Sequence, residues 1–256
     1  MKRVLTALFL VPVAVYSVLF APWWIFTAVV ALVAVLCFKE YAEITGSFAP
    51  LGYVAGLLIL IAPSPLIFMI IMLSAVAAMC MPLAQDSLEQ SVPRAASLAL
   101  GILYVFGAWK AALLIRDVGP AGKHWLMFAL MVNWIGDTGA YYVGRNFGRH
   151  KLAPSVSPGK TWEGAIASLA TGMIFGMVYL PLAIPSVSLA TAALVAVLGN
   201  AAGQLGDLAE SAIKRGAGVK DSGTLLPGHG GLLDRMDSTI FTLPVIYSLL
   251  LALQKV

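Results

Sequence analysis

Long apolar runs separated by short polar breaks dominate this chain of 256 residues. Runs bounded by proline, glycine or charge predict helices at 4–20, 22–43, 49–62, 65–83, 95–116, 122–144, 162–181, 188–214 and 237–254. An α-helix of roughly 20 apolar residues crosses a bilayer core about 30 Å thick. The runs therefore predict an all-α, polytopic membrane helical bundle with about nine transmembrane helices.

The composition supports a membrane protein and argues against a nucleic-acid-binding one. Hydrophobic residues make up 60% of the chain and charged residues 11%, whereas a soluble domain has about 25% charged residues. The net charge of +4 is spread over short loops rather than gathered on one face, so nucleic acid is not an expected partner. No convincing cleavage site follows Met1–Arg3 and the first apolar run, so we interpret this run as an uncleaved helix.

Basic residues predict the orientation of the chain, because loops on the cytoplasmic side carry the excess of lysine and arginine. With the N-terminus inside, the outside segments hold only Arg116, Lys123 and Lys255, and most of the 16 basic residues fall inside. Two long polar loops, 145–161 and 215–236, are then cytoplasmic. We expect a multi-pass protein of the bacterial inner membrane.

Charge divides the chain into two regions of one integral membrane unit. Residues 1–83 hold few charged residues, among them Lys39, Glu40 and Glu43, whereas 133–238 hold most of the acids. We interpret residues 1–95 as N-terminal transmembrane scaffold helices and 96–256 as the transmembrane catalytic region.

The eighth predicted helix carries a polar stripe. Asn200, Gln204, Asp207, Ser211 and Lys214 recur at spacings of four, three, four and three, which places them on one helix face. A carboxylate within a membrane usually faces the bundle interior or a wet cavity and is often functional. A structural Asp207–Lys214 pair is the alternative, but such a pair needs no stripe of five residues.

The sixth predicted helix repeats this pattern with Asn133 and Asp137, four residues apart. Gly136, Ala140 and Gly144 follow the same spacing, and small residues let a neighbouring helix approach closely. Asp137 is expected to line the same cavity as Asp207. The row of small residues by itself favours helix packing.

The segment before the seventh helix contains Ser157, Lys160 and Thr161 close to a glycine. It is not a P-loop, because Pro154 stands where the first glycine of that motif belongs. A lysine and hydroxyls at a helix N-terminus still suit a phosphate group. Alternatively, Thr161 caps the helix and Lys160 anchors at lipid headgroups.

Acids and bases alternate across the glycine-rich segment from Ser211 to Ser238. Asp234 and Asp237, three apart at a helix start, offer hard oxygen ligands that suit Mg²⁺. The bases can neutralise phosphate charge; they are Lys214, Arg215, Lys220 and Arg235. The pattern predicts a polyphosphate–metal site rather than a solvated loop, and His229 suits either a turn or a catalytic role.

At this point the chain resembles the phosphatidate cytidylyltransferase (CDP-diacylglycerol synthase) family. The resemblance rests on Ser211, Lys214, Arg215, Lys220, Asp221, Pro227, His229, Gly230, Gly231, Asp234, Arg235 and Asp237. The Asp137 segment and residues 155–164 are also similar, whereas residues 1–95 match only in hydrophobicity. The resemblance implies a CTP-dependent, Mg²⁺-requiring enzyme acting on phosphatidic acid among membrane lipids, with a homodimer as the expected assembly.

The predicted reaction is in-line attack of the lipid phosphate on the α-phosphorus of CTP, with pyrophosphate leaving. The predicted metal ligands for Mg²⁺, with room for a second cation, are Asp207, Asp234 and Asp237. The predicted catalytic residues are Asp207, Asp221, Asp234, Asp237, Lys214 and His229. The predicted substrate-binding residues are Asn133, Asp137, Ser157, Lys160, Thr161, Ser211, Arg215, Lys220 and Arg235.

Other functions stay open on the sequence alone. A related CTP-dependent lipid kinase, or a cytidylyltransferase acting on an ether lipid, would use a similar site. An ion-coupled transporter could use Asp137, Asp207 and Glu210 as an ion pathway. Transporters often show repeat-related broken helices, and the sequence shows no evident repeat of this kind.

Overall fold

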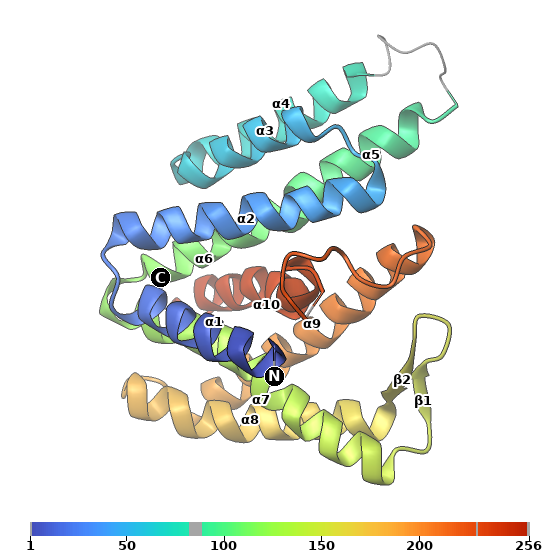
Figure 1. Ribbon diagram of the computed structural model, residues 1–256. Helices are drawn as coiled ribbons and strands as arrows, with labels where there is room; N and C mark the ends of the chain where they lie inside the picture. The colour runs from blue at the N-terminus through green and yellow to red at the C-terminus, as the bar shows by residue number, and fades with distance from the viewer. Residues whose placement is uncertain (1, 82–88, 229, 255–256) are drawn as a thin grey trace.

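The computed structural model describes residues 2–81, 89–228 and 230–254, and within these ranges the regular secondary structure is helical apart from a short hairpin (Figure 1). Its α-helices are α1 (Lys2–Leu19), α2 (Trp23–Thr45), α3 (Ala49–Ile61), α4 (Ser64–Cys80), α5 (Ser91–Gly101), α6 (Ala108–Arg116), α7 (Gly122–Phe147), α8 (Trp162–Ala183), α9 (Leu189–Gly216) and α10 (Leu233–Ala252). A π-helical segment, η2 (Ile102–Gly107), joins α5 to α6, and a 3₁₀ turn, η3 (Gly119–Ala121), precedes α7. The all-α class is confirmed.

A helix lies in each of the nine predicted ranges, since α5, η2 and α6 together form the one predicted at 95–116, and residues 82–83 of the fourth range lie outside the described residues. Four helical stretches are long and apolar enough to cross a membrane within the described parts of the chain: α2, Ser91–Arg116, α8 and α9. Two others are shorter: α3 has 13 residues, below the usual length of a transmembrane helix, and α4 has 17, at the lower end of that range. The structure therefore supports a membrane protein, while the count of nine spans stays a prediction.

The loop predicted at 145–161 contains a two-stranded antiparallel hairpin. Strand β1 (Lys151–Ala153) pairs with β2 (Ser157–Thr161), with Lys151 opposite Thr161. Such short strands lack the alternating apolar pattern that marks a strand in sequence. The hairpin delivers β2 directly to the start of α8, which places Lys160 and Thr161 beside that helix.

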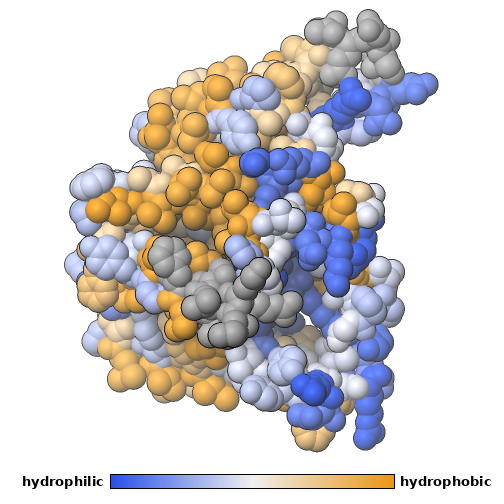
Figure 2. Space-filling model, viewed as in Figure 1, coloured by the Kyte–Doolittle hydropathy of each residue, from blue (hydrophilic) through white to orange (hydrophobic). Residues whose placement is uncertain are grey.

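Successive helices run back and forth between two sides of the molecule in Figure 1. The hairpin, the connection between α2 and α3, and the connection between α9 and α10 lie toward one side, whereas the α6–α7 and α8–α9 connections lie toward the other. Figure 2 shows hydrophilic side chains gathered along the side of the hairpin and largely hydrophobic ones on the opposite side. The two long polar loops therefore share one end of the bundle.

An aromatic cluster holds the N-terminal helices together. The rings of Phe38 and Phe106 lie 5.2 Å apart between centroids, and both are fully buried. On α3, Gly52 and Gly56 face these rings so closely that a Cβ at either position would collide with Phe38 or Phe106. Glycine therefore sets how closely α3 approaches its neighbours.

Two basic side chains satisfy helix-end carbonyls within the apolar region. Lys110 Nζ donates to the carbonyl oxygens of Leu60 at 3.0 Å and Ala62 at 2.7 Å, at the end of α3. Arg116 donates to the Val18 and Ala21 carbonyls at the end of α1. These carbonyls have no intrahelical partner, so the bases stabilise the helix ends away from water.

Side-chain amides join the C-terminal helices. Asn200 on α9 accepts from Ser168 Oγ on α8 at 3.1 Å and donates to the Val132 carbonyl on α7 at 3.2 Å. Asn133 Nδ2 donates to Thr242 Oγ1 on α10 at 2.8 Å. Interhelical bonds of this kind stabilise membrane bundles, so this part of the predicted polar stripe has a packing role.

The close approach of α3 generates a stability prediction. Gly56→Ala adds a Cβ against the Phe106 ring, and overpacking of this kind costs about 1–3 kcal/mol. We expect a lower midpoint of thermal unfolding in detergent. Gly107→Ala is the matched control, because a Cβ there meets nothing within 4 Å; an equal loss in both variants would contradict the packing argument.

Candidate active site

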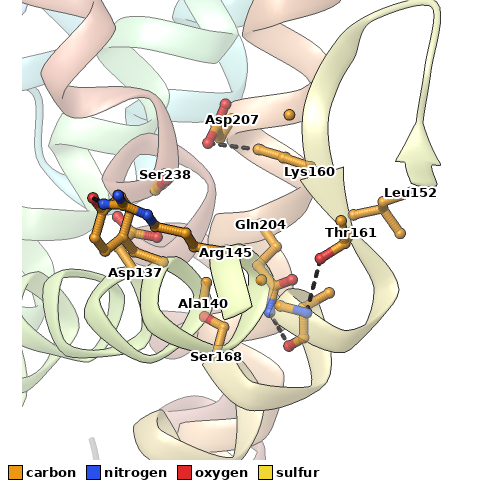
Figure 3. Close-up of a pocket in the computed structure, with 15 residues that line it drawn as sticks. Asp137, Ala140, Arg145, Leu152, Lys160, Thr161, Ser168, Gln204, Asp207 and Ser238 are labelled. Atoms are coloured by element: carbon orange, nitrogen blue, oxygen red, sulfur yellow. Dashed lines mark hydrogen bonds and ion pairs between the residues drawn. The ribbon is translucent and has the colours of Figure 1, made fainter. Parts of the chain in front are cut away.

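Two cavities meet at the hairpin end of the bundle, and Asp137, Asp207 and Ser238 line both. The first has a volume of about 370 Å³ and lies among α7, the hairpin, α8 and α9. In Figure 3, Lys160 and Thr161 lie on one side of Asp207, and Asp137 and Ser238 lie on the other. This cavity is lined by polar groups and by small residues that leave space.

The second cavity, of about 490 Å³, has two chemically different walls. Its polar wall comes from α7, α9, α10 and the segment before α10, and comprises Asn133, Asp137, Asp207, Lys214, Asp221, Asp234, Arg235, Asp237, Ser238 and Thr239. Its apolar wall includes Leu10, Val11, Val13 and Ala14 of α1, Val29 and Val33 of α2, and Trp134 of α7. The cavity is therefore amphiphilic, and α1 supplies much of its apolar side.

Lys160 and Asp207 form the ion pair that faces the first cavity. Lys160 Nζ lies 2.6 Å from Asp207 Oδ2, and both side chains are partly exposed. Thr161 accepts from the Gly164 amide as the N-cap of α8, as the sequence suggested. Ser211 Oγ lies 3.4 Å from Asp207 Oδ1, so the structure brings the three predicted site residues Lys160, Asp207 and Ser211 together.

Asp137 and Asp237 make few polar contacts of their own. Asp237 accepts one hydrogen bond, from the Ser238 amide at 2.6 Å, and Asp137 forms no hydrogen bond or ion pair with any residue that the structure describes. The carboxylates of Asp137, Asp207 and Asp237 all line the second cavity. Like charges repel in such a site, so this wall favours a cation.

Lys214 lies between two buried carboxylates. Its Nζ is 2.5 Å from Glu210 Oε2 and 2.6 Å from Asp234 Oδ1. The Glu210 contact is a short ion pair without well-directed hydrogen-bond geometry, and its Oε1 has no hydrogen-bond partner in the described part of the chain. Lys214 is therefore engaged in fixing α9 against α10.

Asp234 has its oxygens occupied by protein donors. Besides Lys214, it accepts from the Ser222 amide at 2.9 Å and from the Gly231 amide at 2.8 Å. Three partners in a buried position leave little capacity for a further ligand. Its geometry fits a residue that orders the 222–233 segment, whereas Asp237 remains available to the cavity.

Glu40 on α2 reaches the same segment, and it is not among the predicted site residues. It is 4% exposed and accepts hydrogen bonds from Ser222 Oγ, the Leu232 amide and the Leu233 amide. One signal could have identified it: a carboxylate within a predicted apolar span is costly unless it has partners. Arg145 and Ser238, which line the first cavity, were also missed.

The remaining predicted residues lie in different places. Asp221 and Arg235 line the second cavity, as does Asn133 in spite of its packing role. Ser157, Arg215 and Lys220 line neither cavity; Ser157 is in β2, and Arg215 donates to the Val219 carbonyl at 3.3 Å. His229 lies outside the described residues. The catalytic roles of these residues stay predictions.

The predicted metal ligands Asp207, Asp234 and Asp237 do not converge. Across residues 2–81, 89–228 and 230–254, no three aspartate, glutamate, histidine or cysteine side chains form a group that could hold a metal ion. Asp207 and Asp237 share the second cavity, but Asp234 is held away by its protein partners. Metal binding by these residues stays a prediction.

Comparison with known proteins gives a family match across nearly the whole chain. A model described as "Cytidylyltransferase family" matches residues 1–253. Proteins named phosphatidate cytidylyltransferase are similar: that of Staphylococcus haemolyticus is 48% identical over 130 residues, covering 51% of this chain and 50% of its own length. That of Bacillus subtilis is 38% identical over 153 residues, covering 60% of this chain and 57% of its own length. The aligned regions thus span about half the length of these relatives.

The position of Lys214 generates a prediction about stability. Lys214→Met removes the cation between Glu210 and Asp234, and an uncompensated buried charge costs about 3–5 kcal/mol. We expect a large fall in the thermal unfolding midpoint in detergent. The control is Arg215→Met at the next, exposed position; equal midpoints for the two variants would contradict a structural role for Lys214.

Proposed function

The chain belongs to the cytidylyltransferase family, and on this premise we propose that it transfers a cytidylyl group from CTP to phosphatidic acid. The products are CDP-diacylglycerol and pyrophosphate. The name of these relatives, phosphatidate cytidylyltransferase, indicates the two substrates. The observation that carries the proposal is the meeting of two cavities at Asp137, Asp207 and Ser238, one with basic side chains on its wall and one with an apolar wall from α1 and α2.

The two cavities suit two substrates of different polarity. The first, with Arg145, Lys160 and the start of α8 on its wall, offers positive charge for a triphosphate. The second has an apolar wall from α1 and α2 beside a charged one, which suits a lipid with a phosphate headgroup. The reacting phosphates then meet at the wall that the cavities share.

The donor chemistry of the shared wall fits a magnesium ion. Asp207 and Asp237 are carboxylates with free capacity, and Asp137 has no protein partner among the residues described; Mg²⁺ prefers such hard oxygen ligands. No three carboxylates converge among the described residues, so we propose that Asp137, Asp207 and Asp237 come together as ligands when the ion binds, with Asp234 as a positioning residue in place of a ligand. When bound, Mg²⁺ supplies charge neutralisation at the phosphates.

The protein's own residues position the reactants and balance their charge. An oxygen of the lipid phosphate forms the new bond to the α-phosphorus of CTP, the bond to the β-phosphate oxygen breaks, and pyrophosphate leaves with that electron pair. A phosphate monoester has a second pKa near 6, so the nucleophile is largely ionised at neutral pH and needs no strong base. Lys160 and Arg235, which line the two cavities, stabilise the developing charge.

We propose further that the site opens to the cytoplasm at the bacterial inner membrane. The two long polar loops share the hydrophilic end of the bundle (Figure 2), and the distribution of basic residues favours the cytoplasm for that end. CTP would then arrive from the cytoplasm, while the lipid enters from the bilayer. The homodimer implied by the resemblance stays a prediction.

A product assay tests the function. Detergent-purified protein is incubated with CTP, phosphatidic acid and Mg²⁺, and the lipid products and pyrophosphate are measured, with each component omitted in turn. We expect CDP-diacylglycerol and pyrophosphate in equal amounts, and both only in the complete mixture. A phosphorylated lipid with release of CDP would instead identify a lipid kinase, and turnover only with an ether lipid would change the substrate.

The aspartates of α10 generate a prediction that separates metal binding from positioning. Asp237→Asn weakens a hard-cation site, so the Mg²⁺ concentration at half-maximal rate should rise about tenfold or more, with little loss of stability. Asp234→Asn breaks contacts to Lys214 and two amides, so it should lower the unfolding midpoint with little change in Mg²⁺ demand. A Mg²⁺ titration and a thermal unfolding measurement on both variants test this prediction. A higher Mg²⁺ demand in Asp234→Asn and a lower unfolding midpoint in Asp237→Asn would show that the two roles are exchanged.

A further inference from the structure

We propose that Glu40, in the N-terminal half of the chain, is a positioning residue for the proposed reaction. Its carboxylate holds the first turn of α10 and the segment before it, and so keeps Arg235, Asp237 and Ser238 at the cavity wall. The role in the reaction rests on the proposed function, whereas the clamp rests on the hydrogen bonds of Glu40 alone. Glu40 touches neither cavity, so its effect is exerted through the residues that it holds.

The carboxylate caps a helix that belongs to a distant part of the chain. Glu40 Oε1 accepts from the Leu232 amide at 3.0 Å, and Oε2 accepts from the Leu233 amide at 2.8 Å. The first amides of a helix have no partner within it, and the N-cap residue of α10, Leu232, has no side chain that can accept. Glu40 takes over this capping, and its negative charge is favourable at a helix N-terminus.

The segment before α10 is shaped to receive this carboxylate. A Cβ on Gly231 would collide with the Glu40 carboxylate and with Ser222 Oγ, and a Cβ on Gly223 would also press on Glu40. Glu40 is 4% exposed and forms no ion pair within the described ranges. A buried carboxylate is stable only when hydrogen bonds replace its hydration, and these come from this segment.

Ser222 connects Glu40 to the ion pairs of α9. Its hydroxyl donates to Glu40 Oε2 at 2.9 Å and accepts from the Asp234 amide at 3.2 Å. Asp234 in turn binds Lys214 at 2.6 Å. A continuous polar network thus runs from α2 through the segment before α10 to α9. Loss of Glu40 removes the end of this network that orients the start of α10.

Kinetic comparison of Glu40 variants tests the proposal. Glu40→Gln retains an acceptor oxygen, whereas Glu40→Ala removes all three hydrogen bonds. We expect kcat to fall about tenfold in the Gln variant and about a hundredfold in the Ala variant, because α10 groups act mainly on the transition state. The KM for CTP should change less than about threefold, since Lys160 and Arg145 come from other elements.

Glu43→Gln is the matched control. Glu43 lies one turn further along the same helix, is 60% exposed and forms a 3.8 Å ion pair with Lys39. This variant should retain wild-type kinetics. If Glu40→Ala does not fold, Glu40→Gln and Ser222→Ala test the proposal in its place, since both variants should lower kcat. Wild-type kcat in a folded Glu40→Ala or Glu40→Gln variant would overturn the proposal.

Hydrogen–deuterium exchange tests the clamp independently of turnover. In Glu40→Gln, amides of residues 222–228 and 230–234 should exchange at least about tenfold faster than in wild type, while those of α7 and α8 stay unchanged. Uniform acceleration over the N-terminal helices, without a local effect, would show that Glu40 serves only general stability. If the wild-type protein shows no activity, the proposed function is wrong, but the exchange measurement still tests whether Glu40 holds the start of α10.

Discussion

Buried charges that are paired with one another or with backbone amides organise the end of this molecule that carries both cavities. Lys214 joins Glu210 and Asp234 across α9 and α10, and Glu40 binds the segment between those helices. In a low-dielectric environment each of these groups is costly without its partners and favourable with them. The network therefore fixes the start of α10, and with it the wall on which Asp237 and Ser238 meet Asp207 and Asp137.

Polar residues of the same helix serve different purposes along its length. Asn200 binds neighbouring helices, Asp207 faces the cavities, and Lys214 belongs to the buried network. A helical stripe shows that these residues share a face, but the face meets different surroundings at each turn. The hypothesis of a functional stripe and its structural alternative thus each describe part of α9.

The contrast between Asp234 and Asp237 illustrates why a motif does not assign roles. Both carboxylates lie in the first two turns of α10 and have the same chemistry. The amides of Ser222 and Gly231 occupy Asp234, whereas Asp237 accepts, among the described residues, only from the adjacent backbone. Distance to donors on other elements distinguishes an orienting carboxylate from one available to a ligand, and spacing along the sequence carries no such information.

The sequence by itself determined the membrane class, the helical ranges and the concentration of charge in 133–238, because apolar runs and helical spacing act locally along the chain. It also predicted that Asp137, Lys160 and Asp207 belong to one site. Only the tertiary structure decided that α1 lines the second cavity, that 151–161 forms a hairpin, and that Glu40 binds Ser222, 182 residues further along the chain. Contacts between such distant segments depend on how helices pack in three dimensions, and local sequence patterns do not predict that packing.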